Sequence, residues 1–271
     1  MKPLVSIVIP TRNSSHTIEE CLSAIQNQSY QNIETIIVDS KSTDDTTKIA
    51  AAKGYRVIFT DWKLLGARYL GCKAASGEFV LMLDSDQILH KDAVEKSLPL
   101  LKDYDMLCLE EISYASDTLI QKMIEAGRRM IHNYAHIQLD PVHGTLLARF
   151  YKKSLLERAF EAIPKPLLPS VVHLDHAIIY YEAWKLSDRV KILPNAVYHN
   201  EEATILELWK KYFRYGRSTR ALMANGYYNE FIRKKTHLRK TDARKITSDK
   251  LLSSLLLLSL KAPAYLLGLY A

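Results

Sequence analysis

The stretch from Phe79 to Asp86, FVLMLDSD, constrains this chain more than any other: five apolar residues are followed by two carboxylates two positions apart. A continuous apolar run of this length predicts a strand that is buried on both faces, as in the middle of an α/β sheet. Ligands of such sheets bind in the crevice outside the carboxyl ends of the strands. We therefore expect Asp84 and Asp86 to lie at a ligand site.

These two carboxylates have no lysine or arginine close by in sequence. Their charges, about 6 to 7 Å apart along the chain, repel each other unless a cation lies between them. A divalent metal that brings phosphates with it is the natural cation, so Asp84 and Asp86 are candidate metal ligands. The alternative is that the pair caps a helix expected from Lys91 onward.

Strands and helices alternate through the first third of the chain. Apolar runs predict strands at Leu4 to Ile9, at Ile33 to Val38 and at Tyr55 to Thr60. Helices are predicted between them, at about 15–28 and 42–54, from the spacing of apolar residues. Short connections of this kind predict a parallel, right-handed, doubly wound α/β sheet. The first loop, IPTRNSS, lacks G-x-G-x-x-G, so the usual dinucleotide cradle is not expected.

Two further polar residues are expected at the edge of the sheet that carries Asp84. Asp39 ends the second strand, and its carboxylate suits the donors of a nucleobase imide or a ribose hydroxyl. An Asx turn in the loop is an equally good interpretation of Asp39. Arg68 lies early in a helix predicted from Leu65 to Gly77, where a guanidinium suits phosphate. The alternative for Arg68 is a solvated surface arginine.

In order and spacing, these motifs resemble the nucleotide-sugar-binding half of the family-2 inverting glycosyltransferases of the GT-A fold. The matching residues are the loop Pro10-Thr11-Arg12-Asn13, Asp39, the helix segment Gly66 to Gly71 with Arg68, and Asp84-Ser85-Asp86. The resemblance departs from the family pattern at Ser40-Lys41, where the family usually has Asp-Gly, and at Tyr69, where it usually has Asn. It implies a Rossmann-like, mostly parallel sheet flanked by helices.

The resemblance also implies roles for these residues. The first loop, Pro10 to Asn13, and Asp39 would hold the base, and Arg68 would lie at the nucleotide. Asp84 would meet the ribose or the sugar, with Ser85 beside it on the donor side. Asp86 would ligate Mn²⁺ or Mg²⁺ bridging the diphosphate, and Asp84 is a second candidate ligand.

The second half of the chain resembles the family less closely. Helices are expected at 92–101 and 116–131, and strands at 106–109 and 146–151. In His173-Leu174-Asp175-His176, Asp175 matches the family's general base, while Leu174 replaces the usual Glu. Inversion by direct displacement needs a base on the face opposite the leaving diphosphate, and one carboxylate suffices. Helix capping is the alternative role for Asp175.

Three more candidate site residues follow. Two short strands are expected around Pro194, and His199 comes after them, where the family commonly has a histidine beside the metal or the diphosphate. A structural histidine is the equally good alternative. Arg214 and Arg217 lie in the next helix and are candidates for the donor phosphates.

A basic, partly apolar appendage is expected after residue 202. We divide the chain into a catalytic domain at 1–202, with a donor half at 1–90 and an acceptor half at 91–202, and an appendage at 203–271. Residues 203–250 carry 13 basic and 4 acidic residues, a local charge of +9, so the rest of a +7 chain sums to −2. The helix predicted from Thr204 to Asn225 has basic and aromatic faces that suit anionic lipid headgroups. No recognised nucleic-acid motif accompanies it, so no nucleic-acid partner is expected.

The last 21 residues, LLSSLLLLSLKAPAYLLGLYA, are nominally long enough to cross a bilayer. Because Lys261 and Pro263 fall in the middle, we expect two short helices lying in one leaflet. The alternative is a helical hairpin packed on the catalytic domain or on a second subunit.

Cys21, Cys72 and Cys108 have no metal-site spacing and are expected to be buried thiols in a reducing compartment. The chain enters a strand at once, so no cleavable signal is expected.

Together these features predict a metal-dependent inverting glycosyltransferase on the cytoplasmic face of the membrane. It would transfer one hexose to a lipid-linked acceptor, since the Gln-x-x-Arg-Trp motif of processive synthases is absent from the sequence. By analogy with membrane-bound members, the first choice is mannose from GDP-mannose. The second is glucose from a UDP donor, transferred to a polysaccharide or protein-linked glycan. One alternative is a catalytically silent nucleotide-binding or membrane scaffold. Another is a nucleotidyltransferase, but that class needs a Gly-rich first loop, and the loop here, IPTRNSS, is not Gly-rich.

Overall fold

The computed structural model of the protein describes residues 2–135, 139–144, 146–236 and 248–271. Within these residues, one sheet has the strand order β3-β2-β1-β4-β7-β6-β8-β5. Strands β1 to β4 pair in parallel, and β7 runs antiparallel between β4 and β6. Strand β8 is parallel to β6, and β5 is antiparallel to β8. The strands are β1 (Val5–Thr11), β2 (Ile33–Asp39), β3 (Arg56–Phe59), β4 (Phe79–Met82), β5 (Gln87–Leu89), β6 (Met106–Ser113), β7 (Ala148–Lys152) and β8 (Val190–His199).

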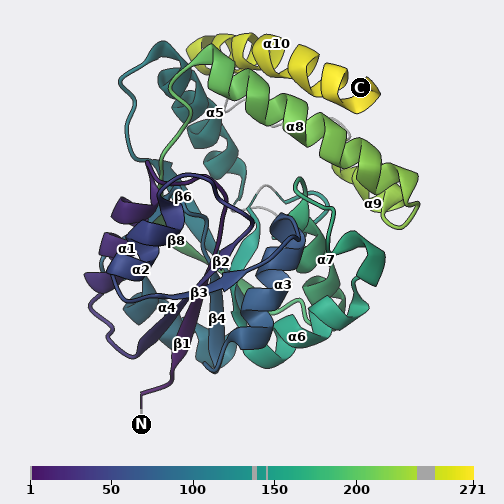
Figure 1. The fold of residues 1–271 in the computed structure, drawn as a ribbon. Helices are drawn as coiled ribbons and strands as arrows, with labels where there is room; N and C mark the ends of the chain where they lie inside the picture. Colours follow the sequence, from purple (N-terminus) through teal and green to yellow (C-terminus); the bar gives the residue numbers. More distant parts are fainter. Residues whose placement is uncertain (1, 136–138, 145, 237–247) are drawn as a thin grey trace.

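Helices cover both faces of this sheet (Figure 1). Helices α1, α2 and α4 lie on one side, and α3, α6 and α7 lie on the other. The helices are α1 (Ile18–Gln26), α2 (Thr46–Ala52), α3 (Leu64–Ala74), α4 (Ala93–Asp103), α5 (Leu119–Ala135), α6 (Lys153–Ala162), α7 (Asp175–Leu186), α8 (Ile205–Ala224), α9 (Asn229–Thr236) and α10 (Ser248–Tyr270), with a short 3₁₀ turn at Lys165–Leu167. The predicted α/β class and mostly parallel sheet are confirmed.

The buried strand β1 shows why the apolar runs are continuous. Successive side chains of a strand point to opposite faces. Ile7 and Ile9 therefore pack in the core on the α1 side, while Val8 packs on the α3 side, and all three are fully buried. Helix α3 approaches the sheet closely at Gly71, where an added Cβ would lie 2.1 Å from Val8 Cγ1. This contact holds the start of α3, with Arg68, near the carboxyl end of β1.

Strand β8 is one strand and not the two that Pro194 led us to expect. The pairing of β6 with β8 shifts register between Leu109 and Glu111, and Asn195 has a positive φ of 50°. A bulge of this kind accommodates a proline that cannot donate to the ladder, and the strand continues beyond it. His199 thus ends a continuous strand, beside the end of β6.

Helix α10 corrects a second expectation, because it is one helix from Ser248 to Tyr270 with Pro263 inside it. An interior proline costs a helix about 3 kcal/mol. Close packing against α8 offsets this cost: an added Cβ at Gly216 would lie 2.1 Å from the Tyr265 carbonyl oxygen, and one at Gly268 would lie 2.1 Å from the Phe213 carbonyl oxygen. The two helices therefore touch backbone to backbone, as the packed-hairpin alternative anticipated in part.

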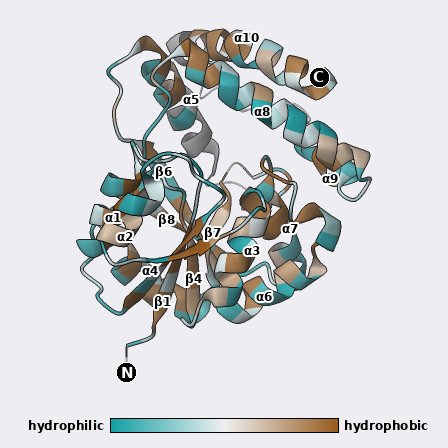
Figure 2. Cartoon of the chain, viewed as in Figure 1, coloured by the Kyte–Doolittle hydropathy of each residue, from teal (hydrophilic) through white to brown (hydrophobic). Residues whose placement is uncertain are grey.

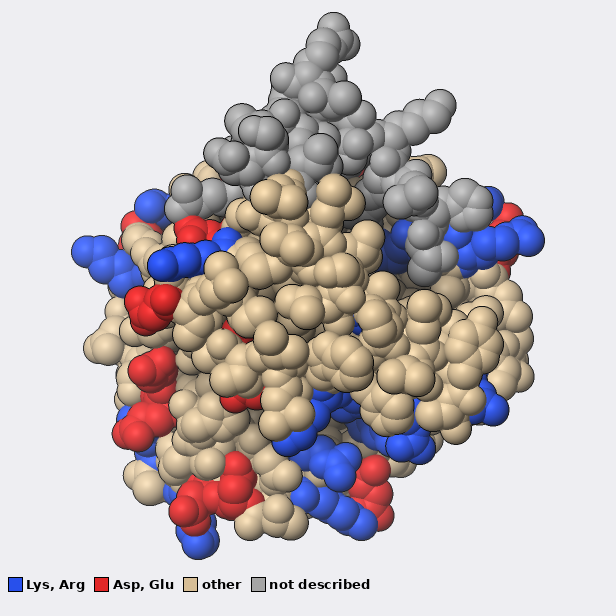
Figure 3. All heavy atoms as spheres, turned by 90° about the horizontal axis from the view of Figure 1, so that it is seen from above, with Lys and Arg blue, Asp and Glu red and all other residues tan. Residues whose placement is uncertain are grey.

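Helices α5, α8 and α10 form a layer at one end of the sheet (Figure 1). Helix α10 is largely apolar in composition (Figure 2), and its exposed large side chains are Leu252, Leu255, Leu256, Leu258, Leu266, Leu267 and Tyr270. Seen from above, the molecule has a broad uncharged area with charged side chains around it (Figure 3). Within the described residues, the stretch Leu252–Tyr270 has the length and composition of a membrane-crossing helix, which by itself is weak evidence.

The three cysteines are free and buried, as predicted.

Candidate active site

A cleft of about 1100 Å³ opens at the carboxyl ends of β1 and β4, under α8. It collects all but two of the candidate residues from the sequence. Those lining it are Pro10, Thr11, Arg12, Asn13, Arg68, Asp84, Ser85, Asp86, Asp175, His199 and Arg214. Asp39 and Arg217 do not line it. Residues that are up to 200 positions apart in sequence therefore share one cavity, at the edge of the sheet where ligands of α/β folds bind.

Asp39 is buried below the loop that follows β1. It accepts hydrogen bonds from Thr11 Oγ1 at 2.9 Å, from the Ser42 amide at 2.8 Å and from Ser42 Oγ at 2.5 Å. These bonds match the turn interpretation, and they fix the loops that carry Asn13 and Ser42. The predicted contact of Asp39 with a base stays a prediction.

Arg68 is not a surface arginine, because its side chain is 0% exposed, and its contact with the nucleotide stays a prediction. Its Nε donates to Asp175 Oδ2 at 2.5 Å, and its Nη2 forms an ion pair with Asp84. One guanidinium thus joins the candidate base to the first aspartate of the Asp-Ser-Asp motif. Sequence spacing gave no sign of this contact, since Asp175 lies 107 positions away.

A second arginine completes the surroundings of Asp84. Arg149 of β7 donates from Nη1 to Asp84 Oδ2 at 2.8 Å, and its Nη2 lies 2.8 Å from Glu111 Oε1. Burial acts to raise the pKa of Asp84, but Arg68 and Arg149 outweigh it and hold that pKa well below its usual range. We expected a cation between the two aspartates. At Asp84 the positive charge comes from two arginines of the protein, Arg68 and Arg149. With both oxygens occupied, Asp84 is a poorer candidate metal ligand than its neighbour.

Asp86 has the opposite surroundings. Its Oδ1 is buried without a hydrogen-bond partner, and its Oδ2 lies 3.7 Å from His199 Nε2. Burial raises the pKa of Asp86, and the charge of Asp84 adds to this while His199 opposes it. No group of three or more His, Cys, Asp or Glu side chains in the described residues is arranged to hold a metal. Mg²⁺ sites commonly use one or two carboxylates plus substrate phosphates and water, so an unpartnered carboxylate beside an imidazole fits a divalent cation.

His199 is held from its other side by residues that sequence reasoning missed. Its Nδ1 lies 3.3 Å from Glu201 Oε1, and Glu201 is ion-paired with Arg128 of α5. Arg128 also lies 2.6 Å from Glu111. Burial lowers the pKa of His199, but Asp86 and Glu201 outweigh it and raise it to about 9. Nδ1 is buried without a hydrogen-bond partner, and Nε2 is the ring nitrogen that faces Asp86. A carboxylate on the Nδ1 side, as Glu201 is here, would favour Nε2 as the nitrogen that faces a metal.

These contacts make one chain of alternating charge across the floor of the site. In order it contains Asp175, Arg68, Asp84, Arg149, Glu111, Arg128, Glu201, His199 and Asp86. The carboxylates outnumber the guanidiniums, and a charged His199 still leaves one net negative charge. Because the interior members are paired on both sides, the unmet charge lies at the Asp86 end.

Asp175 begins α7, and the residue before it has an unusual backbone. Leu174 has a φ of 68°, a left-handed conformation that bulky residues rarely adopt. This turn starts the helix at Asp175, whose carboxylate lines the cleft against Arg68. His173, two residues earlier, stacks on Tyr215 of α8 with ring centroids 4.5 Å apart. Its Nδ1 lies 2.7 Å from Thr219 Oγ1. These contacts tie the segment of the candidate base to the roof of the cleft.

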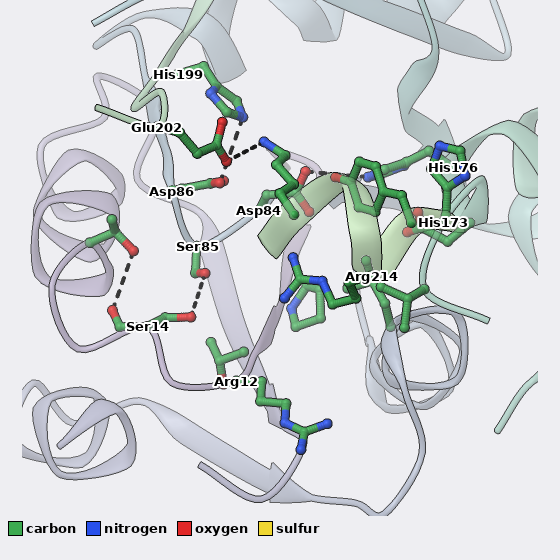
Figure 4. Close-up of a pocket in the computed structure, with 18 of the residues that line it drawn as sticks. Arg12, Ser14, Asp84, Ser85, Asp86, His173, His176, His199, Glu202 and Arg214 are labelled. Atoms are coloured by element: carbon green, nitrogen blue, oxygen red, sulfur yellow. Dashed lines mark hydrogen bonds and ion pairs between the residues drawn. The ribbon is translucent and has the colours of Figure 1, made fainter. Parts of the chain in front are cut away.

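The roof and the far wall carry basic side chains. Lys210, Lys211 and Arg214 of α8 line the cleft, together with Arg12 and Lys63 from the sheet side. Lys211 pairs with Glu202 at 2.6 Å. Figure 4 shows His199 and Glu202 near Asp86, with Arg214 and Arg12 across the cavity from them. Arg217 is exposed on α8 outside this cavity. A negatively charged ligand would thus lie between a cationic roof and the Asp86 end.

Comparisons with known proteins bear on the family and the fold. The model of glycosyl transferase family 2 matches residues 6–159. EpsH of Bacillus subtilis, a putative glycosyltransferase, is 26% identical over 216 residues, which are 73% of this chain and 60% of that protein. The beta-1,3-glucosyltransferase WfgD of Escherichia coli is 34% identical over 108 residues, 36% of this chain and 41% of that protein. The chain thus spans less than two thirds of the length of these curated relatives.

Solved structures resemble the whole fold. TarS 1–349 of S. aureus, in complex with UDP-GlcNAc, superposes with a TM-score of 0.58 and 17% identity over 97% of this chain and 81% of that one. The glucosyl-3-phosphoglycerate synthase of Mycobacterium tuberculosis was solved with Mn²⁺, UDP and phosphoglyceric acid. It superposes with a TM-score of 0.53 and 19% identity over 82% of this chain and 78% of that one. The fold is therefore the predicted GT-A type. Since the family model covers more than half of its residues, the chain belongs to glycosyl transferase family 2.

Proposed function

We propose that the protein transfers a single hexose, with inversion, from a nucleoside-diphosphate sugar to a hydroxyl of a lipid-linked acceptor at a membrane surface. The observation that carries the donor site is the buried, partnerless Asp86 Oδ1 beside His199, facing a cationic roof. A carboxylate oxygen that is buried without a partner is costly unless a cation joins it, and the Asp86 side chain as a whole is 37% exposed, so a cation can reach it from the cleft. Mn²⁺ or Mg²⁺ with a diphosphate meets both the carboxylate and the basic side chains.

In this proposal Asp86 and His199 would hold the cation, and the chemistry it would supply is Lewis-acid stabilisation of the leaving diphosphate. Arg12 and Arg214 bind the phosphates from the opposite wall. Asp175 takes the proton of the acceptor hydroxyl, and Arg68 holds its carboxylate in place. The loop from Pro10 to Asn13, with Ser85, forms the side that receives the nucleoside.

For the donor we propose a UDP-hexose in place of the GDP-mannose that was our first choice. Support comes from the neighbours, since TarS was solved with UDP-GlcNAc and the mycobacterial synthase with UDP. GDP-mannose is the alternative that the experiment below separates. For the acceptor, support comes from WfgD, whose name describes transfer to a sugar on diphosphoundecaprenol.

For membrane attachment, the support is the exposed leucine face of α10 together with the +9 charge of residues 203–250. An apolar helix face with basic residues nearby suits the surface of an anionic, cytoplasmic leaflet. Helix α8 belongs to the predicted appendage at 203–271, yet it roofs the cleft. We therefore propose that the appendage serves both the membrane and the active site, beside a catalytic domain at 1–202.

The donor proposal is tested by calorimetric titration of UDP, GDP and their hexose conjugates, with Mn²⁺ and with EDTA. We expect one nucleotide to bind only with the metal, and a uridine nucleotide to bind at least about tenfold more tightly than a guanosine nucleotide. The reverse preference would return the assignment to GDP-mannose. Absence of binding by every nucleotide with metal would favour the silent scaffold.

Membrane attachment is tested separately by flotation with vesicles. We expect binding to vesicles with anionic lipid, loss of binding when Leu255 and Leu266 are both changed to Glu, and no loss when exposed Lys48 is changed to Ala. Unchanged flotation of the double variant would contradict attachment through α10.

A further inference from the structure

A second cavity, of about 380 Å³, lies next to the catalytic cleft and under the layer of α5, α8 and α10. The two cavities share a wall, because Arg149, His199, Glu201 and Lys211 line both. A molecule in this second cavity would therefore lie beside the Asp86 end of the site.

The cavity has one apolar side. The apolar side chains that line it come from β6, from the segment just before β7, from α5, from α8 and from α10: Leu109, Leu146, Leu147, Ile124, Leu208 and Leu257. Ile124, Leu208 and Leu257 belong to the small buried cluster that joins the three helices. Hydrocarbon is the natural occupant of such a surface, since its burial removes apolar area from water.

The other side is lined by charges of both signs: the carboxylates of Glu111, Glu201 and Glu202, and the cations of Arg128, Arg149, Lys211 and Lys261. Two of these cations have unmet capacity for an anion. Arg128 Nε is buried without a hydrogen-bond partner, although the two terminal nitrogens pair with Glu111 and Glu201. Lys261 lies in the middle of the otherwise apolar α10 and lines the cavity, with its Nζ 5.0 Å from the Tyr212 ring centroid. No ion pair of Lys261 with a carboxylate appears in the described part of the chain.

A partly buried ammonium without an anion is unfavourable. Because of Lys261, the sequence argued against a membrane-spanning helix at the C-terminus. In the structure this side chain lies on the inner side of α10 and lines the cavity. A single anionic group placed between Lys261 and Arg128 would satisfy both cations.

We propose that this cavity binds the lipid-phosphate part of the acceptor. The first isoprenyl or alkyl units lie against Leu208, Leu257 and Ile124, and the phosphate is held by Lys261 Nζ and Arg128 Nε. This inference rests on the proposed transfer to a lipid-linked hydroxyl: the sugar that carries the hydroxyl extends through the shared wall into the cleft, while the rest of the lipid stays in the bilayer on which α10 lies.

The test is calorimetric binding of farnesyl phosphate to the full chain, below its micelle concentration and without nucleotide or metal. Farnesol and inorganic phosphate serve as separate arms, because they carry only one half of the chemistry each. We expect farnesyl phosphate to bind at one site per chain. Farnesol and inorganic phosphate should each bind at least about tenfold more weakly than farnesyl phosphate.

Three variants sharpen the test. Lys261→Met removes the ammonium but keeps the length of the side chain, and should weaken farnesyl phosphate at least about tenfold while leaving farnesol unchanged. Leu257→Trp fills the cavity and should weaken both. Lys234→Met, at an exposed lysine of α9 that pairs with Glu230, should change neither.

Binding of farnesyl phosphate that is equal in wild type, Lys261→Met and Leu257→Trp would overturn the cavity assignment, as would tight binding of inorganic phosphate alone. Metal-dependent nucleotide binding is measured on the same samples. If nucleotide binds and farnesyl phosphate does not, the cavity inference fails and the proposed function stands. If farnesyl phosphate binds in the cavity and no nucleotide binds, the proposed function fails.

Discussion

Asp84 and Asp86 are two residues apart and yet lie in opposite environments. Asp84 is closed in by Arg68 and Arg149, and both of its oxygens are bonded. Asp86 has an oxygen with no partner and one imidazole at 3.7 Å. The difference shows that one carboxylate of the motif is fixed as part of the framework, whereas the other is kept available for a cation. The measurements below test this division of roles, beginning with the largest expected effect.

The strongest contrast is expected in stability. Changing Asp84 to Ala leaves two buried guanidiniums short of a partner, and breaking a buried ion pair in this way costs about 3–5 kcal/mol. Changing Asp86 to Ala removes a carboxylate that pairs with no guanidinium and lies 3.7 Å from His199 Nε2, so the metal-free protein should lose much less stability than Asp84→Ala does. Urea unfolding of both variants measures the two values. Equal losses would contradict the division of roles.

The next effect concerns metal affinity. Because even outer-shell partners of a metal ligand are worth about 10- to 100-fold in affinity, loss of a ligating carboxylate should cost at least about 100-fold. We expect this loss of Mn²⁺ affinity, measured in the presence of the nucleotide, for Asp86→Asn. Asp45→Asn, at an exposed aspartate that pairs with Lys48 and does not line the cleft, is the matched control and should retain Mn²⁺ affinity within about threefold.

A smaller effect is expected behind His199. Glu201 lies 3.3 Å from Nδ1 of His199 and would hold Nε2 toward the metal. Glu201→Gln should therefore weaken Mn²⁺ binding by about 10-fold, within the range for outer-shell residues. Glu202→Gln is the control, because Glu202 pairs with Lys211 and not with the histidine. Equal Mn²⁺ affinity in both variants would show that His199 needs no support from Glu201.

A free-energy effect of similar size is expected as a pH dependence at the roof of the cleft. Burial lowers the pKa of His173 from its ordinary value of 6.5 to about 4. The folded state therefore favours the neutral ring: this stability is present above pH 6.5 and is lost as the pH falls toward 4. Between pH 7 and pH 5 the loss should be about 1–2 kcal/mol.

Replacing His173 with Phe should remove that part of the pH dependence of the free energy of unfolding. The control is His143→Gln, at an exposed histidine, and this variant should keep the pH dependence of wild type. His176 also has a pKa lowered to about 4, through burial and its neighbours Arg149 and Arg68, so some dependence will remain. An identical slope in wild type and His173→Phe would contradict the account of this contact.

The donor side of the fold was predictable from sequence because its signals are local. Each buried strand is a continuous apolar run, and each ends in the polar residues that line the cleft, as in Pro10 to Asn13 and Asp84 to Asp86. The order of these segments fixes a parallel sheet, so their meeting at one edge follows. The general position of Asp175 and His199 was also predictable, through resemblance to the family.

The charge chain was not predictable, because its contacts join distant elements. Arg149, Arg128 and Glu111 lie in a strand, a helix and another strand with no motif around them, and only the packed fold shows that they meet. The same limit explains the error at α10. The disruptive effect of Pro263 is local, but the backbone contact of Gly216 with α10 that compensates for it is not.

The most direct test of the central claim is anomalous diffraction at the manganese edge from crystals soaked with Mn²⁺ and UDP. The account predicts one strong peak bonded to Asp86 and to Nε2 of His199, with Asp84 still held between Arg68 and Arg149. A peak ligated by Asp84, with its arginine contacts broken, would contradict the assignment of the two aspartates.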